Sequence, residues 1–383
     1  MLNAGFEHDQ LVEFYGPACE VLRMNAEKTP SLWKREGVRE MDVRDWLKEK
    51  ETLAFSGVDL VAGGPPCQPF SIGAGERADH ADSRNMFPAA ASAIDLLQPK
   101  LFVFENVPGL LRESFLPYYN YTVDRLKRPS IRPKDGEEWV DHHERIKRAR
   151  RPIEYHVHRE IIDAADLGVP QTRKRVFLIG IRADISGSDE WKPLEFTHSR
   201  AALLHAQWIT GSYWEKRNLL KPDMPLRLTN QIKELRRKGD VPTGAPWRTT
   251  RDAIAGLPEP IDREPAKGFL NHVGIPGART YRGHTGGWID WPAKTIKAGV
   301  HGVCGGEAMI RFLDGEVRYL TVREAARVQS FPDTYELPEK RSVAMRVVGN
   351  AVAVTVAETI GHRLAALLTR ASLGTESDGL AGG

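Results

Sequence analysis

A short apolar run, Val58 to Ala62, leads directly into a loop of glycines and prolines that carries one cysteine, Cys67. Runs of about four to eight apolar residues bounded by glycine and proline predict a buried β-strand. Prolines stiffen the loop, and glycines leave the thiol open to approach because they have no side chain. Open α/β sheets place their reactive groups beyond the carboxyl ends of the strands. The loop predicts such a site, although a bare Pro-Cys pair also fits a tight turn around an inert thiol.

Residues 38–182 alternate short apolar runs with helical stretches, which is the pattern of βαβ units. Residues 101–104 and 176–181 predict two further buried strands, and residues 86–97 predict a helix that ends before Pro99. We therefore expect an α/β fold with a parallel, nucleotide-binding type of sheet.

The texture changes at about residue 197, where glycines, prolines and tryptophans become frequent in short, turn-rich pieces. This predicts a second, smaller and irregular domain. Beyond it, residues 321–329 and 351–371 predict helices. We expect four parts: an α/β domain (1–196), a smaller irregular domain (197–337), a C-terminal segment that returns to the first domain (338–373) and a disordered tail (374–383).

The chain has only three cysteines, Cys19, Cys67 and Cys304, which are too few and too scattered for a disulfide framework or a zinc site. We expect no metal, a reducing compartment and a cytoplasmic location, since neither a signal peptide nor a membrane span of about 18 apolar residues is evident. The formal net charge of +3 is weakly basic. Binding to nucleic acid would therefore depend on local clusters of positive charge.

Two further motifs carry chemistry. Glu105 opens Glu-Asn-Val directly after the second predicted strand, and residues 171–175 read Gln-Thr-Arg-Lys-Arg just before the third. Taken alone, each motif is more typical of a solvated strand end. The planar guanidinium groups of Arg173 and Arg175 are suited to planar hydrogen-bond acceptors.

The order of these motifs, with Gly-Pro-Pro-Cys-Gln-Pro-Phe-Ser at residues 64–71, resembles the cytosine-C5 DNA methyltransferases of bacterial restriction–modification systems. Further matching segments extend the resemblance from about residue 4 to residue 366. It implies a Rossmann-like, S-adenosylmethionine-dependent methyltransferase sheet with a smaller target-recognition domain. It also implies that Cys67 attacks C6 of a flipped-out cytosine, that Glu105 assists at N3, and that Arg175 with Arg173 orients the base.

The same resemblance implies the residues that bind S-adenosylmethionine. Glu13 matches the acid that binds the ribose, and Asp42 with Val43 matches the segment that receives the adenine amine. Asn350 and Val352 lie in Gly-Asn-Ala-Val, which matches the last family motif. A structural role for Asn350, as the cap of a helix from residue 351, is equally open.

One departure from the family pattern concerns the N-terminus. Family members begin with a strand and a Phe-x-Gly-x-Gly-Gly loop beside the cofactor, whereas residues 4–6 of this chain match a segment that follows them. We therefore expect the chain as written to bind the cofactor poorly or not at all, and we attribute the difference to a misplaced start codon or a truncated gene.

The expected macromolecular partner is double-stranded DNA, bound by a monomer, with no membrane involved. A cognate restriction endonuclease would share the DNA site without forming a stable complex. Two sets of basic residues are candidates for phosphate contacts, although solvated helix surface explains each residue as well. They are Arg227, Lys233, Arg236, Arg237, Lys238, Arg248 and Arg251, and Arg145, Lys147, Arg148, Arg150 and Arg151.

Two alternatives remain open. A tRNA cytosine-C5 methyltransferase would share the cysteine loop, although the long tryptophan-rich region and Ser71 favour DNA. A non-catalytic remnant that binds DNA without a working cofactor site would explain the N-terminal departure. The recognition sequence, the base-reading residues and the base that removes the C5 proton do not follow from the sequence.

Overall fold

The computed structural model describes residues 1–28, 33–66, 85–185, 187–282, 285–298 and 308–380. Its strands are β1 (Leu11–Glu13), β2 (Val38–Glu40), β3 (Leu60–Gly63), β4 (Leu101–Asn106), β5 (Tyr155–Asp163), β6 (Lys174–Arg182), β7 (His198–Ser199), β8 (Ala245–Pro246), β9 (Gly287–Trp288), β10 (Met309–Arg311) and β11 (Val317–Tyr319). Its α-helices are α1 (Gly16–Ala26), α2 (Val43–Trp46), α3 (Phe87–Leu97), α4 (Leu116–Lys127), α5 (Trp139–Arg148), α6 (Arg200–Leu204), α7 (Ser212–Glu215), α8 (Thr229–Lys238), α9 (Thr250–Ile254), α10 (Val322–Val328), α11 (Arg341–Asn350) and α12 (Val354–Leu380).

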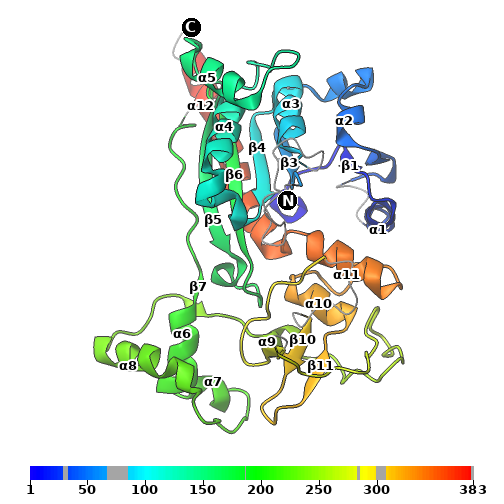
Figure 1. Cartoon of the computed structure of the whole chain (residues 1–383), viewed down its shortest axis with the longest axis vertical. Helices are drawn as coiled ribbons and strands as arrows, with labels where there is room; N and C mark the ends of the chain where they lie inside the picture. Colours follow the sequence, from blue (N-terminus) through cyan, green and yellow to red (C-terminus); the bar gives the residue numbers. More distant parts are fainter. Residues whose placement is uncertain (29–32, 67–84, 186, 283–284, 299–307, 381–383) are drawn as a thin grey trace.

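The largest sheet has the strand order β3-β4-β6-β5 and occupies the upper half of the molecule in Figure 1. β3 and β4 run parallel, as predicted, but β6 is antiparallel to both β4 and β5. The expected parallel pairing is therefore correct for β3 and β4 and incorrect for β6. Residues 164–173 join β5 to β6 without an α-helix, and a parallel crossover needs about a dozen residues or more, usually including a helix.

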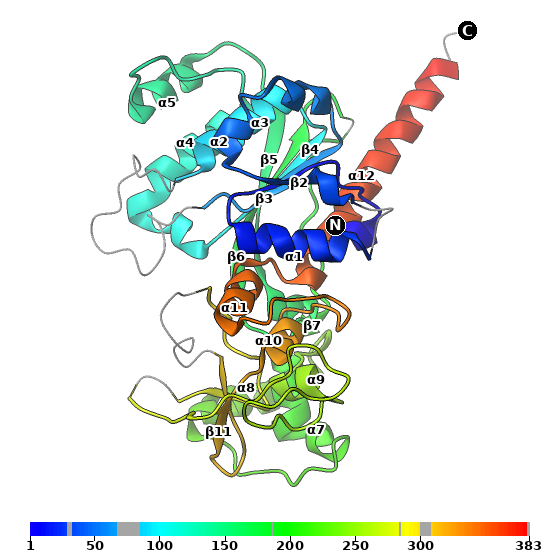
Figure 2. The ribbon, with the colours of Figure 1, turned by 90° about the vertical axis from the view of Figure 1, so that its right-hand side faces the viewer.

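The two faces of this sheet bury different helices. Alternate residues of β4 point to opposite faces, so Phe102 and Phe104 pack with α3 and α4, whereas Leu101 and Val103 pack against α12. Figure 1 shows α12 behind the sheet, and Figure 2 shows its far end projecting from the body. β4 is thus covered on both sides, and its carboxyl end is held rigidly for the site described below.

β1 and β2 form a separate parallel pair, in which Glu13 lies opposite Glu40. No ladder in the described part of the chain joins β1 to β3. The apolar strand residues Leu11, Val12, Leu60 and Val61 are only half-buried, although strands inside a parallel sheet are normally covered on both faces. The nucleotide-type sheet is thus present as two separate sheets, β1-β2 and β3-β4-β6-β5, and the described ladders do not pair β1 with β3.

The lower half contains short elements and a second core built on tryptophans. Trp208, Trp214 and Trp247 are buried with Leu203 and Ile232, in the region between β7 and β9 where the sequence predicted an irregular domain. α10 follows a capping box between Thr321 and Glu324. Its core cluster includes Val21 of α1, so the two halves share buried contacts.

Residues 341–370 are the one stretch, within the described part of the chain, that is long and apolar enough to cross a membrane. This stretch comprises two helices, α11 and most of α12, and its residues Val348, Ile360 and Leu364 lie in the protein core. We assign it to core packing for that reason. α12 continues to Leu380, past residue 374 where a disordered tail was expected.

Candidate active site

Glu105 and Arg175 meet at the carboxyl end of β4. Nε of Arg175 lies 2.6 Å from Oε1 of Glu105, and the side chains are 16 % and 15 % exposed. Nη1 of Arg175 also donates to the carbonyl oxygen of Lys174 at 2.8 Å. The two residues are 70 positions apart in the sequence, and the antiparallel pairing of β4 with β6 brings them together. The result is a largely buried acid–arginine pair that opens to solvent on one side.

The loop that leads to Cys67 passes this pair. Nδ2 of Asn106 donates to the carbonyl oxygen of Pro65 at 3.1 Å, and the amide of Met86 donates to Pro66 at 3.0 Å. A Cβ at Gly64 would lie 3.4 Å from Oε2 of Glu105, so glycine permits this close approach. Cys67 itself lies outside the described residues, but the residue before it is fixed next to the strand end that carries Glu105.

Arg173 is a buried arginine whose guanidinium binds main-chain carbonyl groups. It is 4 % exposed, and its guanidinium donates to the carbonyl oxygens of Ile296 (3.1 Å), Gly349 (2.9 Å) and Ala351 (3.1 Å). Burial, followed by the nearby charge of Arg175, lowers the pKa of Arg173 to about 10. The expectation that Arg173 orients the base beside Arg175 does not fit these contacts, because its Nη atoms are used to hold main chain.

Two buried glutamines complete this main-chain clamp. Gln171 donates from Nε2 to Oε1 of Gln329 at 2.9 Å, and its own Oε1 accepts from the amide of Ile296 at 2.9 Å. Gln329 donates to the carbonyl oxygen of Val348 at 2.8 Å. Sequence analysis included Gln171 in a motif and Gln329 in a predicted helix, and it assigned a role to neither. Together with Arg173, they hold three segments together: the residues just before β6, the segment around residue 296 and the end of α11.

The candidate ribose and adenine residues lie at the carboxyl ends of β1 and β2. Oε1 of Glu13 accepts from the amide of Tyr15 at 2.8 Å. Asp42 caps α2, whose first residue is Val43, and accepts three hydrogen bonds from Arg44. These bonds are the largest cause of the lowered pKa of Asp42, so its carboxylate is a fixed acceptor. Because the two strands are parallel, both acids lie at the same edge of this two-stranded sheet.

Asn350 is the last residue of α11 rather than the cap of the following helix, which begins at Val354. The alternative structural role proposed for Asn350 was therefore wrong. Asn350 is exposed and Val352 is half-buried. Before them, Gly349 packs so closely on the main chain that a Cβ there would lie 2.6 Å from the amide nitrogen of Ala298. The turn 349–352 is thus held in place by backbone contact and by Arg173.

Sequence analysis missed Phe14, which lies between Glu13 and Tyr15 and is 68 % exposed. Aromatic side chains commonly line ligand pockets, and an exposed ring face can stack on a flat ligand. The available signal was its position directly after Glu13, the residue that the family resemblance assigned to the ribose.

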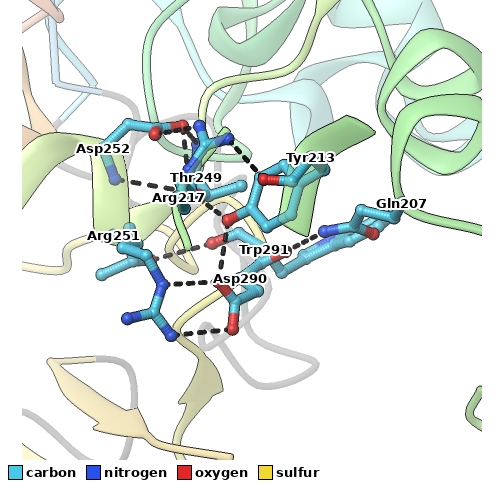
Figure 3. Close-up of polar contacts among 9 residues, drawn as sticks. Gln207, Tyr213, Arg217, Thr249, Arg251, Asp252, Asp290 and Trp291 are labelled. Carbon is cyan, nitrogen blue, oxygen red and sulfur yellow. Dashed lines mark hydrogen bonds and ion pairs between the residues drawn. The ribbon is translucent and has the colours of Figure 1, made fainter. Parts of the chain in front are cut away.

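A polar network ties the recognition region together (Figure 3). The fully buried Asp290 accepts from the hydroxyl of Tyr213 at 2.8 Å, and from Nε and Nη2 of Arg251 at 2.6 and 2.9 Å. Its carbonyl oxygen accepts from Gln207 at 2.6 Å. Thr249 joins Tyr213 to the start of α9. The network joins α7, α9 and the segment after β9, so this region has a defined scaffold despite its short elements.

The two basic sets do not form one patch. α5, with Arg145, Lys147 and Arg148, lies at the opposite end of the molecule from α8, with Lys233, Arg236 and Arg237 (Figures 1 and 2). Arg145 pairs with Glu137, and Lys147 with Glu144, which favours a solvated helix face for α5. Within the described part of the chain, no cluster of three or more His, Cys, Asp and Glu side chains forms a metal site.

Comparison with known proteins identifies the family. The family model for C-5 cytosine-specific DNA methylases matches residues 1–128 and 140–366. The type II methyltransferase M.NgoMIV of Neisseria gonorrhoeae is 26% identical over 362 residues, covering 94% of this chain and 91% of the relative. M.Eco47II of Escherichia coli is 28% identical over 376 residues, covering 96% and 76%.

Solved structures agree at the level of the fold. A prophage-encoded protein of E. coli assigned as a DNA modification methyltransferase superposes with a TM-score of 0.54 at 21% identity, covering 96% of this chain and 94% of that one. Dnmt2 of Schizosaccharomyces pombe superposes with a TM-score of 0.50 at 16% identity, covering 94% and 91%. By the family match across most of its length, the chain belongs to the C-5 cytosine-specific DNA methylases and is a DNA cytosine-5 methyltransferase.

Proposed function

We propose that this methyltransferase modifies C5 of cytosine within a specific duplex sequence, using S-adenosylmethionine and a covalent bond between Cys67 and C6 of a flipped-out base. The observation that carries the proposal is the Glu105–Arg175 pair beside the loop that leads to Cys67. A nucleophile, an acid and a guanidinium at one strand end are the groups that this chemistry requires.

In the proposed sequence of steps, the Cys67 thiolate adds to C6 and the C5–C6 double bond opens. Arg175 would turn its hydrogen bonds from Glu105 to the planar acceptor edge of the base. Glu105, no longer paired, would take up a proton from solvent and pass it to N3 as the thiolate adds. The enamine carbon C5 would then form a bond to the methyl group that S-adenosylmethionine would supply when bound, and the sulfur–methyl bond would break to leave the neutral thioether. C5 then loses its proton to a base, the C6–Sγ bond breaks, the double bond re-forms and N3 returns its proton.

The residues around Glu13 fit the adenosine part of the cofactor. The second oxygen of Glu13 is available for ribose hydroxyls, since Oε1 is the atom that accepts from Tyr15. Phe14 offers an exposed ring face for a flat base, and Asp42 offers a fixed acceptor for its amine. Asn350 and Val352 would close the pocket from the other side.

We also expect the cofactor affinity of this chain to be weaker than micromolar. Glu13 and the Cys67 loop follow strands in two separate sheets, and no described ladder connects them. No strand ladder in the described part of the chain therefore fixes the distance between the end of β1 and the end of β3. Micromolar binding of S-adenosylmethionine by the 383-residue chain would refute this expectation.

The proposed substrate is double-stranded DNA bound by a monomer in the cytoplasm. The named relatives are type II methyltransferases, which supports a role beside a restriction endonuclease that reads the same site without forming a stable complex. The DNA would lie between the sheet and the recognition region.

The test is base-resolution sequencing of 5-methylcytosine in DNA from cells that express the chain, with Cys67→Ser as the control. We expect methylation at one short motif that disappears in the variant. Methylation of tRNA but not of duplex DNA would favour the tRNA enzyme instead. DNA binding without Cys67-dependent methylation would favour the non-catalytic remnant, particularly if no in-frame Phe-x-Gly-x-Gly-Gly is encoded upstream.

A further inference from the structure

The Glu13 turn and the 349–352 turn of the proposed cofactor site come from opposite ends of the chain, and a cation–π contact between Tyr15 and Arg346 lies close to both. The guanidinium carbon of Arg346 lies 4.1 Å from the centroid of the Tyr15 ring. Tyr15 follows Glu13 and Phe14 at the start of α1. Arg346 lies in α11 one turn before Asn350, and residues four apart lie on the same helix face. The contact therefore connects the turn after β1 with the turn 349–352.

Tyr15 is well anchored on its own side. Its amide donates to Oε1 of Glu13 at 2.8 Å, and its carbonyl oxygen accepts from the amides of Ala18 and Cys19 at 2.8 and 3.2 Å. The first bond orients the carboxylate of Glu13, and the other two fix the first turn of α1. Movement of the Tyr15 backbone would consequently move the candidate ribose acid.

Arg346 has no carboxylate partner among the described residues, and its guanidinium contacts the ring of Tyr15. A guanidinium within about 6 Å of a ring centroid is attracted by the ring quadrupole, and the attraction increases when water is partly excluded. Both side chains are half-buried. α1 and α11 also pack through Val21, which shares a buried cluster with Met345 and Val348. The Tyr15–Arg346 contact lies beyond that cluster in sequence, next to Glu13 at one end and one turn from Asn350 at the other.

We propose that Tyr15 and Arg346 are a positioning pair, which holds the Asn350 turn against the Glu13 turn and so sets the affinity for the adenosine part of the cofactor. This inference rests on the proposed cofactor site. It predicts that the ring and the guanidinium are needed together, whereas the tyrosine hydroxyl is not.

The test measures binding of S-adenosylhomocysteine to the full chain by calorimetry at millimolar ligand, with DNA affinity and the urea midpoint measured in parallel. Arg346→Gln and Tyr15→Leu should each weaken ligand binding by about two- to tenfold and leave DNA affinity unchanged. Tyr15→Phe should bind as the parent does. Arg363→Gln is the matched control. The guanidinium carbon of Arg363, on α12, lies 5.9 Å from the centroid of the Trp191 ring, which is the same kind of contact away from the proposed cofactor site.

The double variant Arg346→Gln/Tyr15→Leu should bind S-adenosylhomocysteine about as well as the single variant with the larger loss, because both changes remove the same contact. Unchanged binding in Arg346→Gln, additive losses in the double variant, or equal losses in Arg363→Gln would overturn the pairing. If the parent chain binds no ligand at millimolar concentration, the proposed cofactor site itself fails, and the pair with it. That failure is recognised in the unsubstituted chain, before any variant is compared.

Discussion

Replacing Arg173 should destabilise the protein while sparing the chemical step. Replacing both Glu105 and Arg175 should abolish the chemical step while leaving the stability close to that of the parent. Arg173→Met keeps the length of the side chain and removes its donors. The double variant Glu105→Gln/Arg175→Met removes the active-site ion pair without leaving a lone buried charge. Comparing the two separates an arginine that supports the site from one that acts in it.

The magnitude follows from the acceptors that Arg173 serves. The carbonyl oxygens of Ile296 and Gly349 lose their side-chain donor, whereas Ala351 keeps Nε2 of Gln329 at 3.3 Å. An unsatisfied buried acceptor costs roughly 1–3 kcal/mol, which gives about 2–6 kcal/mol for two. Part is offset because a guanidinium no longer has to be buried, so the free energy of unfolding should fall by about 2–4 kcal/mol.

The assay combines urea unfolding with methyl transfer to duplex DNA at a temperature where both variants are folded. Arg173→Met should lower the urea midpoint clearly and keep kcat within about tenfold of the parent, a change of about 1.4 kcal/mol in the barrier. The double variant should unfold near the parental midpoint with no detectable transfer. A fully stable Arg173→Met variant that has lost transfer would refute the reasoning, since Arg173 would then contact the substrate.

Three further outcomes are expected. Burial raises the pKa of the Cys19 thiol to about 11, so iodoacetamide should modify Cys67 in the native protein and leave Cys19 unmodified until it unfolds; equal labelling of both by mass spectrometry would contradict this. Burial lowers the pKa of His142 in the folded protein. Its contribution to stability is therefore present above the unfolded-state pKa of about 6.5 and is lost as pH falls through the folded-state pKa. Urea midpoints measured from about pH 8 to 5 should fall with acidity, and they should fall less steeply in His142→Gln. Asp290→Asn removes the charge that holds Arg251. Because Arg251 is partly exposed, we expect the free energy of unfolding to fall by roughly 2 kcal/mol. DNA binding should weaken while binding of S-adenosylhomocysteine stays unchanged, and unaltered DNA affinity would show that the network does not shape the recognition surface.

Local sequence patterns predicted the elements whose ends are set by local chemistry. α3 begins one residue after the predicted start and ends at Leu97, as expected. The predicted helix 321–329 includes both caps of α10, because Thr321 and Glu324 form a capping box that the sequence determines. β4 and β6 coincide with apolar runs that are buried in the structure.

Direction and pairing were harder to predict, because an apolar run carries no sign of its orientation. β5 was missed, since its charged and histidine residues, such as His156 and Arg159, interrupt the apolar pattern. Once β5 and β6 are recognised as a hairpin, the antiparallel direction of β6 follows from the short connection between them. That direction places Arg175, rather than the far end of its strand, beside Glu105.

The role of Arg173 shows the limit of reading a motif by residue type. Arg173 and Arg175 are chemically identical and two positions apart, yet one binds three carbonyl oxygens and the other an acid. The difference lies in segments more than a hundred residues away, at Ile296 and Gly349, whose carbonyl groups would otherwise be buried without donors. Backbone acceptors leave no mark in a sequence, so the partner of a buried arginine is decided by tertiary packing. An arginine next to a catalytic motif is therefore as well suited to supporting the site as to reacting in it, and only the geometry distinguishes the two.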